Sequence, residues 1–177
     1  MLAKNLRILQ VNLNRSPIAT ESTLQMAIEL SIDIIVAQEP CLVGASATPA
    51  DFSAARSISH PSFIQILPPL PSPSTRPRVL LYVSRSFQAQ INPVSNFSSP
   101  DPDIFAVTVN NRDFSFTLLN LYNEKDQLGT GRSTLQRALL SNSVPPACLL
   151  LGDFNTHHHW WDPATSVVST EAEQLVD

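Results

Sequence analysis

The stretch LLLGDFNTHHHWWDP, residues 149–163, places an acid, an amide and three histidines directly after an apolar run. Asp153 and Asn155 are two residues apart just past an expected strand, so alternation of side chains directs both to the same side. A carboxylate can orient and deprotonate water, and an amide N–H can bind phosphate oxygens without adding repulsive charge. The pair indicates phosphate-ester chemistry, and the alternative is a simple turn with Asx caps.

Glu39 closes a second apolar run, IVAQEP. A carboxylate at the end of an otherwise buried strand needs a cation or a set of donors, because an unpaired buried charge is costly. Magnesium is a natural partner, since it prefers oxygen ligands and commonly uses only one or two protein carboxylates. Asn12 ends LRILQV in the same way, and Tyr122 in LLNLYN could donate its phenol proton to a phosphate. The alternatives are an exposed loop glutamate and a tyrosine that only packs.

The elements that position these residues begin with a strand over 6–11. Ser16 and Pro17 are suited to the N-cap and first position of a helix of about three turns. Residues 32–37 predict a second strand, which Pro40 ends, so the chain starts with a βαβ-like unit. The expected apolar face of the helix consists of Ile18, Leu24, Met26, Ala27, Ile28 and Leu30.

The remaining chain predicts mostly strands joined by long connections. Residues 41–61 are expected to form a long loop, and 68–77 contain five prolines and cannot be regular structure. The turn-forming cluster Asn110-Asn111-Arg112-Asp113 predicts a hairpin. The expected elements are strands over 63–67, 79–83, 104–109, 114–122 and 147–151, and a helix over 133–140.

Polar residues end several of these apolar strands, at Asn12, Glu39, Tyr122 and Asp153. In layered α/β folds such strand ends converge on one edge, where ligands bind. The sequence therefore predicts a layered α/β fold with one cleft at that edge. No repeat of fixed period is present, which argues against a solenoid.

The joint pattern of QVN, then QEP after one helix, then NLYN and GDFN resembles the endonuclease/exonuclease/phosphatase superfamily. More narrowly, QVNLNRS, IVAQEP and GDFNTHHHWWDP are similar to the endonuclease domain of LINE-type, non-LTR retrotransposons. The resemblance covers nearly the whole chain. It implies a DNase I-like fold, an α/β two-layer β-sandwich flanked by helices, formed as a single domain over residues 1–177.

The resemblance also implies roles for individual residues in a magnesium-dependent phosphodiesterase that nicks target DNA. Asp153 would align or activate the attacking water, Asn155 would hold the phosphate and Tyr122 would contact it. Glu39 and Asn12 would help to hold Mg²⁺, with Asn14 beside them. His157 and His158 would line the DNA side of the cleft, and Trp161 would pack beneath it; the alternative for this segment is simple loop packing.

One departure from the family pattern concerns the C-terminal end. The pattern continues beyond GDFN to a Ser-Asp-His motif, and the chain ends at Asp177 without one. We therefore expect a domain truncated before its final strands, with an unpaired apolar edge in the second sheet. The function suggested is the endonuclease domain of a retrotransposon-type polyprotein encoded with a reverse transcriptase. The alternatives are a phosphatase of the same superfamily that acts on a small phosphoester, and an inactive retroelement remnant.

Composition and charge limit the classes of protein to which the chain can belong. The chain has 43% hydrophobic and 15% charged residues, which is typical of a globular protein. The net charge of -4 requires a local basic patch or a metal ion for any DNA contact. Arg76, Arg78 and Arg132 are the best candidates for such a patch, although most arginines are expected to be ordinary solvated residues. Three consecutive histidines, 157–159, do not favour a zinc site.

Cysteine use and hydropathy suggest a protein of a reducing compartment. Cys41 and Cys148 do not form a CxxC pair, so neither a disulfide framework nor a zinc knuckle is indicated. No apolar run reaches the roughly 18 residues of a membrane span, and the N-terminus does not resemble a signal peptide. We expect an intracellular protein, nuclear or cytoplasmic, without a membrane partner.

Overall fold

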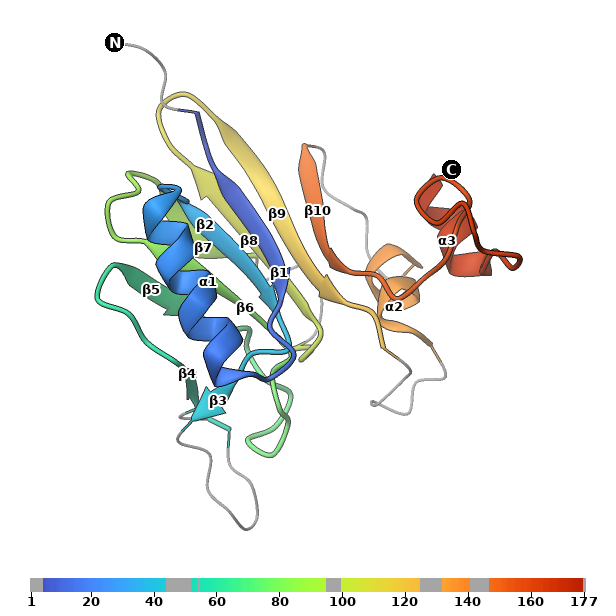
Figure 1. Ribbon diagram of the computed structural model, residues 1–177, viewed down its shortest axis with the longest axis horizontal. Coiled ribbons are helices and arrows are strands. Elements are labelled where there is room, and N and C mark those ends of the chain that lie inside the picture. Colours follow the sequence, from blue (N-terminus) through green and yellow to red (C-terminus); the bar gives the residue numbers. More distant parts are fainter. Residues whose placement is uncertain are drawn as a thin grey trace.

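The computed structural model describes residues 5–43, 52–53, 55–94, 100–124, 132–140 and 147–176. Two four-stranded sheets are stacked face to face, and α1 (Pro17–Glu29) covers the outer face of the first (Figure 1). α2 (Thr134–Leu140) packs on the outer face of the second sheet. The layered α/β architecture expected from the sequence is thus confirmed.

The first sheet contains the βαβ unit at the start of the chain. Its strands β1 (Ile8–Asn12) and β2 (Ile34–Gln38) are parallel and are joined through α1. Ser16 caps α1, because its hydroxyl accepts a hydrogen bond from the Ala19 N–H at 3.2 Å, and Pro17 is the first helical residue. The sheet is completed by β6 (Val79–Ser84) and β5 (Phe63–Ile66), in the order β1-β2-β6-β5.

The buried face of α1 differs from the expected one. Leu24 and Ala27 are buried as expected, but Thr20 and Thr23 are buried with them, and Ile18 is 76% exposed. The four buried residues follow the i, i+3, i+4, i+7 spacing of one helix face, and this face rests on the first sheet. The other residues expected on the buried face, Met26, Ile28 and Leu30, are exposed.

The second sheet contains the predicted hairpin. Its strands β8 (Ile104–Asn110) and β9 (Ser115–Tyr122) are antiparallel, and β10 (Cys148–Asp153) lies parallel to β9. β7 (Gln90–Pro93), which the sequence did not indicate, pairs with β8 on the other side. The order is β10-β9-β8-β7, so β10 is an edge strand among the described residues, and Leu149 on it is 39% exposed.

Two short features fall outside the predictions. β3 (Leu42–Val43) and β4 (Arg56–Ser57) form a small antiparallel pair inside the span that was expected to be one loop. α3 (Thr170–Val176) follows the histidine and tryptophan segment. The proline-rich connection over 68–77 has no helix or strand, as expected. Among the described residues, no helix combines the length and apolar character of a membrane span.

The main core lies between the two sheets. Ile34, Val36 and Leu81 of the first sheet pack against Val107 and Leu118 of the second, and all five are fully buried. A chain of amides, of which Gln38 and Asn120 are buried, crosses the same interface. Gln10 donates to Gln38 at 2.6 Å, Gln38 donates to Asn120 Oδ1 at 2.7 Å, and Asn120 donates to the carbonyls of Ala37 and Leu80. Because buried amides must satisfy their hydrogen bonds, this chain fixes the register between the sheets.

Candidate active site

The predicted site residues come from the ends of strands in both sheets. Asn12 is the last residue of β1 and Glu39 directly follows β2 in the first sheet. In the second sheet Tyr122 ends β9 and Asp153 ends β10, and the parallel register places these two residues directly opposite each other. The sheet packing brings the two pairs to one end of the sandwich.

Asn12 and Asp153 join the two sheets at this end. The Asn12 Nδ2 donates to Asp153 Oδ2 at 2.7 Å, although 141 residues separate them along the chain. The Asn12 Oδ1 in turn accepts the backbone N–H of Asn14 at 2.8 Å. Both ends of the Asn12 amide are therefore used, and its orientation relative to the Asp153 carboxylate is fixed.

Asn155 is held beside Asp153 by the backbone carbonyl of Asn123. The Asn155 Nδ2 donates to the Asn123 carbonyl at 2.8 Å, and the Asn155 N–H donates to Asp153 Oδ1 at 3.3 Å. Asn123 is buried, and its Oδ1 accepts the Leu135 N–H at 3.0 Å at the start of α2. An amide nitrogen carries two protons, so Asn155 keeps one for a ligand.

Glu39 is the most enclosed carboxylate of the group. Its side chain is 12% exposed and lies 2.7 Å from the Arg15 guanidinium. Its backbone N–H donates to the Arg78 carbonyl at 2.8 Å, and its backbone carbonyl accepts the Arg15 N–H at 2.8 Å. The backbone segments that carry Arg15 and Arg78 therefore both hold Glu39 at the end of β2.

Tyr122 connects Glu39 to the second sheet. Burial raises the pKa of its phenol, and the charge and hydrogen bond of Glu39 raise this pKa further, whereas the nearby Arg78 opposes the shift. The Arg78 guanidinium carbon lies 5.2 Å from the centre of the Tyr122 ring. The phenol therefore stays protonated at neutral pH and remains a hydrogen-bond donor.

Backbone strain concentrates at this end of the sandwich. Asn14, Arg15, Glu39 and Asn155 all have φ between 45° and 56°, and they form most of the non-glycine residues with positive φ in the described part of the chain. Each such conformation costs of order 1–3 kcal/mol and persists only where surrounding contacts impose it. This clustering is typical of a functional site.

Gly152 allows β10 to reach the site. A Cβ at this position would lie 2.1 Å from the Leu121 carbonyl oxygen on β9. Only glycine permits this close approach of the two strands. The close approach of β10 to β9 at Gly152 thereby places the next residue, Asp153, beside Tyr122.

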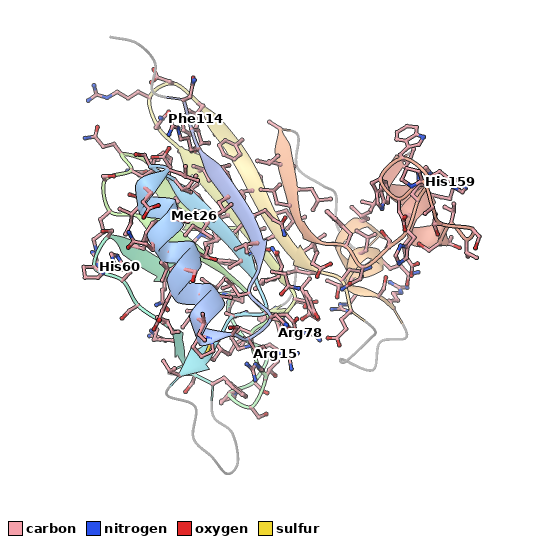
Figure 2. All side chains as sticks on the ribbon, in the orientation of Figure 1. Arg15, Met26, His60, Arg78, Phe114 and His159 are labelled. Atoms are coloured by element: carbon pink, nitrogen blue, oxygen red, sulfur yellow. The ribbon has the colours of Figure 1, made fainter. Side chains whose placement is uncertain are left out.

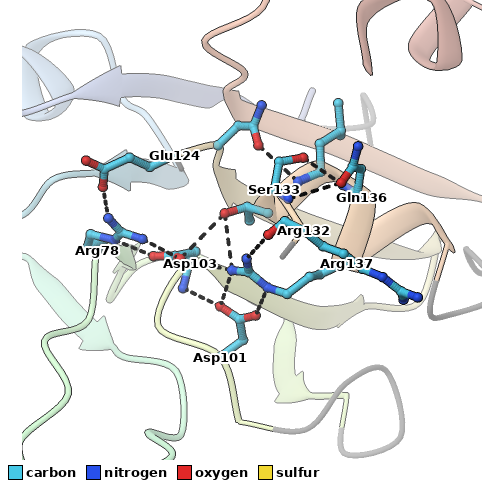
Figure 3. Close-up of polar contacts among 11 residues, drawn as sticks. Arg78, Asp101, Asp103, Glu124, Arg132, Ser133, Gln136 and Arg137 are labelled. Atoms are coloured by element: carbon cyan, nitrogen blue, oxygen red, sulfur yellow. Dashed lines mark hydrogen bonds and ion pairs between the residues drawn. The ribbon is translucent and has the colours of Figure 1, made fainter. Parts of the chain in front are cut away.

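An ionic network surrounds Arg78, the residue that packs against the Tyr122 ring, and its contacts are drawn in Figure 3. Arg78, 3% exposed, pairs through two nitrogens with the Asp103 carboxylate and also with Glu124. Arg137 pairs with Asp101 at 2.9 Å and with Asp103 at 3.1 Å. Arg78 is not the solvent-accessible DNA contact that the sequence suggested, because it is buried and pairs with Asp103 and Glu124. Sequence reasoning missed this structural role, although Arg78 directly precedes the apolar strand β6.

The histidine segment lies beyond β10, with His159 far from Arg15 and Arg78 in Figure 2. His157 has a side chain that is 69% exposed, and its Nδ1 lies 2.7 Å from Asp162 Oδ2. His158 is instead 7% exposed, accepts the Trp160 N–H at 3.1 Å and packs against the Trp161 ring. The burial of His158 departs from the expected lining role and indicates packing, whereas His157 remains accessible near Asn155.

The donor set fits a magnesium ion. Glu39 and Asp153 supply carboxylate oxygens and Asn12 supplies an amide, all on strand ends that meet. Magnesium usually takes one or two protein carboxylates and completes its shell with water and phosphate. Among the described residues, no group of three or more His, Cys, Asp or Glu side chains is arranged to hold a metal ion.

Comparison with known proteins places this geometry in context. Residues 116–177 match a family model described as endonuclease-reverse transcriptase. The fold matches the endonuclease domain of TRAS1, a telomere-specific non-LTR retrotransposon, with a TM-score of 0.68 and 18% identity. The match covers 97% of this chain and 68% of that one. The chain resembles a retrotransposon endonuclease domain. A search of curated proteins finds no significant relative.

The endonuclease likeness confirms the family resemblance seen in the sequence and the DNase I-like fold class. The matched family segment contains Tyr122, Asp153 and Asn155, whereas Asn12 and Glu39 lie outside it. The structure nevertheless brings all five to one end of the sandwich, with Asn14 beside them. Arg15, which forms an ion pair with Glu39, was not predicted from the sequence as a site residue.

Proposed function

We propose that this retrotransposon endonuclease-like domain is a magnesium-dependent phosphodiesterase that nicks target DNA. The observation that carries the proposal is the contact of Asn12 with Asp153, which unites carboxylates and amides from both sheets in one site. The proposal treats residues 1–177 as part of a single catalytic domain, encoded with a reverse transcriptase. DNA is the proposed substrate, and no membrane partner is invoked.

The roles of the residues at β9 and β10 follow from their chemistry. The Asp153 carboxylate, oriented by Asn12, aligns and deprotonates the attacking water. The second amide proton of Asn155 binds a phosphate oxygen, because the first is held by the Asn123 carbonyl. Tyr122, whose phenol is protonated at neutral pH and meets Glu39 in the metal-free protein, would donate its proton to the same phosphate once Glu39 holds the metal ion.

Glu39 and Asn12 would hold the magnesium ion, with Asp153 close by. The ion would supply neutralisation of the charge that develops on the phosphate oxygens. Glu39 is suited to this role because its side chain is largely enclosed and forms an ion pair with Arg15, which is half exposed. Asn14 and His157 lie on the accessible side and are proposed to contact the DNA strand.

The test is nicking of supercoiled plasmid DNA by the purified protein in magnesium and in EDTA. We expect nicked circles in magnesium only, and their loss in Asp153→Asn. Asp113→Asn, in the exposed turn between β8 and β9, is the matched control and should nick normally. The same preparations are tested on a small phosphomonoester. Turnover of that ester without nicking would support the phosphatase alternative, and activity on neither substrate would contradict a catalytic role.

A further inference from the structure

Arg15 contacts Glu39 through both its backbone and its side chain. Its backbone N–H donates to the Glu39 carbonyl at 2.8 Å, and its guanidinium Nη2 lies 2.7 Å from Glu39 Oε1. The two side chains differ in exposure, at 50% for Arg15 and 12% for Glu39. The backbone of Arg15 is therefore held in place, while half of its side chain is exposed to solvent. The guanidinium can change its ion-pair partner by a side-chain rotation, without a movement of the backbone.

A second arginine lies close to this ion pair. The pKa of Arg76 is lowered first by burial and then by the positive charge of Arg15, while Glu39 and Cys41 oppose the shift. The Arg76 Nη2 is 3.5 Å from the Pro40 carbonyl, directly after Glu39. Two guanidinium groups therefore lie within electrostatic reach of one carboxylate. In a chain of net charge -4, two arginines beside one carboxylate give a local excess of positive charge next to the candidate site.

We propose that Arg15 is an exchangeable counter-ion, which neutralises Glu39 in the metal-free protein and binds a DNA phosphate, together with Arg76, once a divalent cation takes Glu39. This inference rests on the proposed function. It adds a residue that couples metal loading to substrate binding.

Charge balance gives the reason for the exchange. A divalent cation and a guanidinium compete for the same enclosed carboxylate, and the dication has the stronger Coulomb attraction. Arg15 released from Glu39 would face Arg76 and the metal ion, and the single negative charge of Glu39 does not balance these three cations. A phosphate resolves this repulsion, and the planar guanidinium can bind it through two hydrogen bonds.

The first arm of the test measures magnesium affinity by titration calorimetry without DNA. Arg15→Gln removes the competitor, so magnesium should bind a few-fold to roughly tenfold more tightly than in the wild type. Arg112→Gln, in the turn next to Phe114 at the opposite end of the sheets (Figure 2), should leave the affinity unchanged. Equal or weaker magnesium binding by Arg15→Gln overturns the proposal.

The second arm measures binding of a short DNA duplex in EDTA and in calcium, which permits binding without cleavage. Arg15→Gln should bind DNA like the wild type in EDTA, where Arg15 is held by Glu39, and more weakly in calcium. In calcium its salt dependence should fall by about one phosphate contact. Arg76→Gln should weaken DNA binding in both conditions. A defect of Arg15→Gln that is equal in EDTA and calcium overturns the exchange.

The Glu39→Gln variant distinguishes a failure of this inference from a failure of the proposed function. If Glu39→Gln binds magnesium as tightly as the wild type, the metal site itself is wrong, and the exchange fails with it. If Glu39→Gln loses magnesium while Arg15→Gln gains none, the metal site stands and only the exchange is wrong. Thermal unfolding of each variant verifies that it is folded before titration.

Discussion

The Asn12 amide donates to the Asp153 carboxylate at 2.7 Å, from the end of β1 in one sheet to the end of β10 in the other. Each residue alone is an ordinary polar strand end. Their contact exists only because the two sheets pack in one register, which the amide chain of Gln10, Gln38 and Asn120 fixes. The candidate active site is thus a product of the sheet interface rather than of one loop.

Asn12→Ala should reduce DNA nicking more than it reduces stability. The substitution removes a hydrogen bond to a charged group, worth about 1.5–3 kcal/mol, from an exposed position. We expect a loss of roughly ten- to a hundred-fold in rate, measured as initial nicking velocity. Asn92→Ala, at an exposed position of β7, is the matched control. Unchanged nicking by Asn12→Ala would show that the contact does not orient Asp153.

The Tyr122 phenol should titrate above its ordinary pKa of about 10 in the metal-free protein. Glu39→Gln should lower this pKa, because the charge and hydrogen bond of Glu39 are two of its causes. The chain has only two tyrosines, and burial raises the pKa of the other, Tyr82, to about 12. Ultraviolet difference titration can therefore resolve them, with Tyr122→Phe assigning the signal.

The sign of the associated stability change follows from the direction of the shift. A pKa raised by folding contributes stability that is complete below the ordinary phenol pKa and is lost as the pH rises through the raised value. Tyr122→Phe should therefore show less loss of stability above about pH 10 than the wild type. An identical alkaline decline in both proteins would indicate that Tyr122 is not perturbed.

Arg78→Met should destabilise the fold by about 3–5 kcal/mol, because it leaves the buried Asp103 carboxylate with one partner fewer. Chemical denaturation measures the free energy of unfolding. Arg112→Met, on an exposed turn, should change it by less than about 0.5 kcal/mol. The account of Arg78 fails if both variants unfold at the same denaturant concentration.

Gly152→Ala should displace β10 from β9. The added Cβ meets the Leu121 carbonyl oxygen at 2.1 Å, and overpacking of this kind typically costs about 1–3 kcal/mol. Nicking should fall further than stability, because Asp153 is the next residue along the strand. A variant with wild-type activity and stability would show that the strands can separate without disturbing Asp153.

Strand positions were predictable because each strand is a distinct apolar run with a polar end. The parallel pairing of β1 with β2 follows from the helix between them, and the hairpin of β8 with β9 follows from its turn residues. β7 was not predictable, since Gln90–Pro93 is short, polar and mostly exposed on the sheet edge. The face of α1 was misjudged because Thr20 and Thr23 lie on its buried side, where the Thr20 hydroxyl is satisfied by the Ser16 carbonyl at 2.8 Å.

The site was predictable only as a set of strand ends. Asn12, Glu39, Tyr122 and Asp153 could be identified because a polar residue closing an apolar run needs a partner. Arg15 carried no such signal: it lies in a short connection, and its partner Glu39 is reached through a left-handed turn that local sequence does not encode. Long-range ion pairs of this kind depend on tertiary packing.

The most direct test of the central claim is a magnesium titration of plasmid nicking by wild type, Asp153→Asn and Glu39→Gln. Asp153→Asn should lose about a hundred- to ten-thousand-fold in rate at every magnesium concentration, because it lacks the group that activates water. Glu39→Gln should recover part of its activity at high magnesium, because it mainly lowers metal occupancy. Near-normal nicking by Asp153→Asn, or identical magnesium responses of the two variants, would contradict the proposed site.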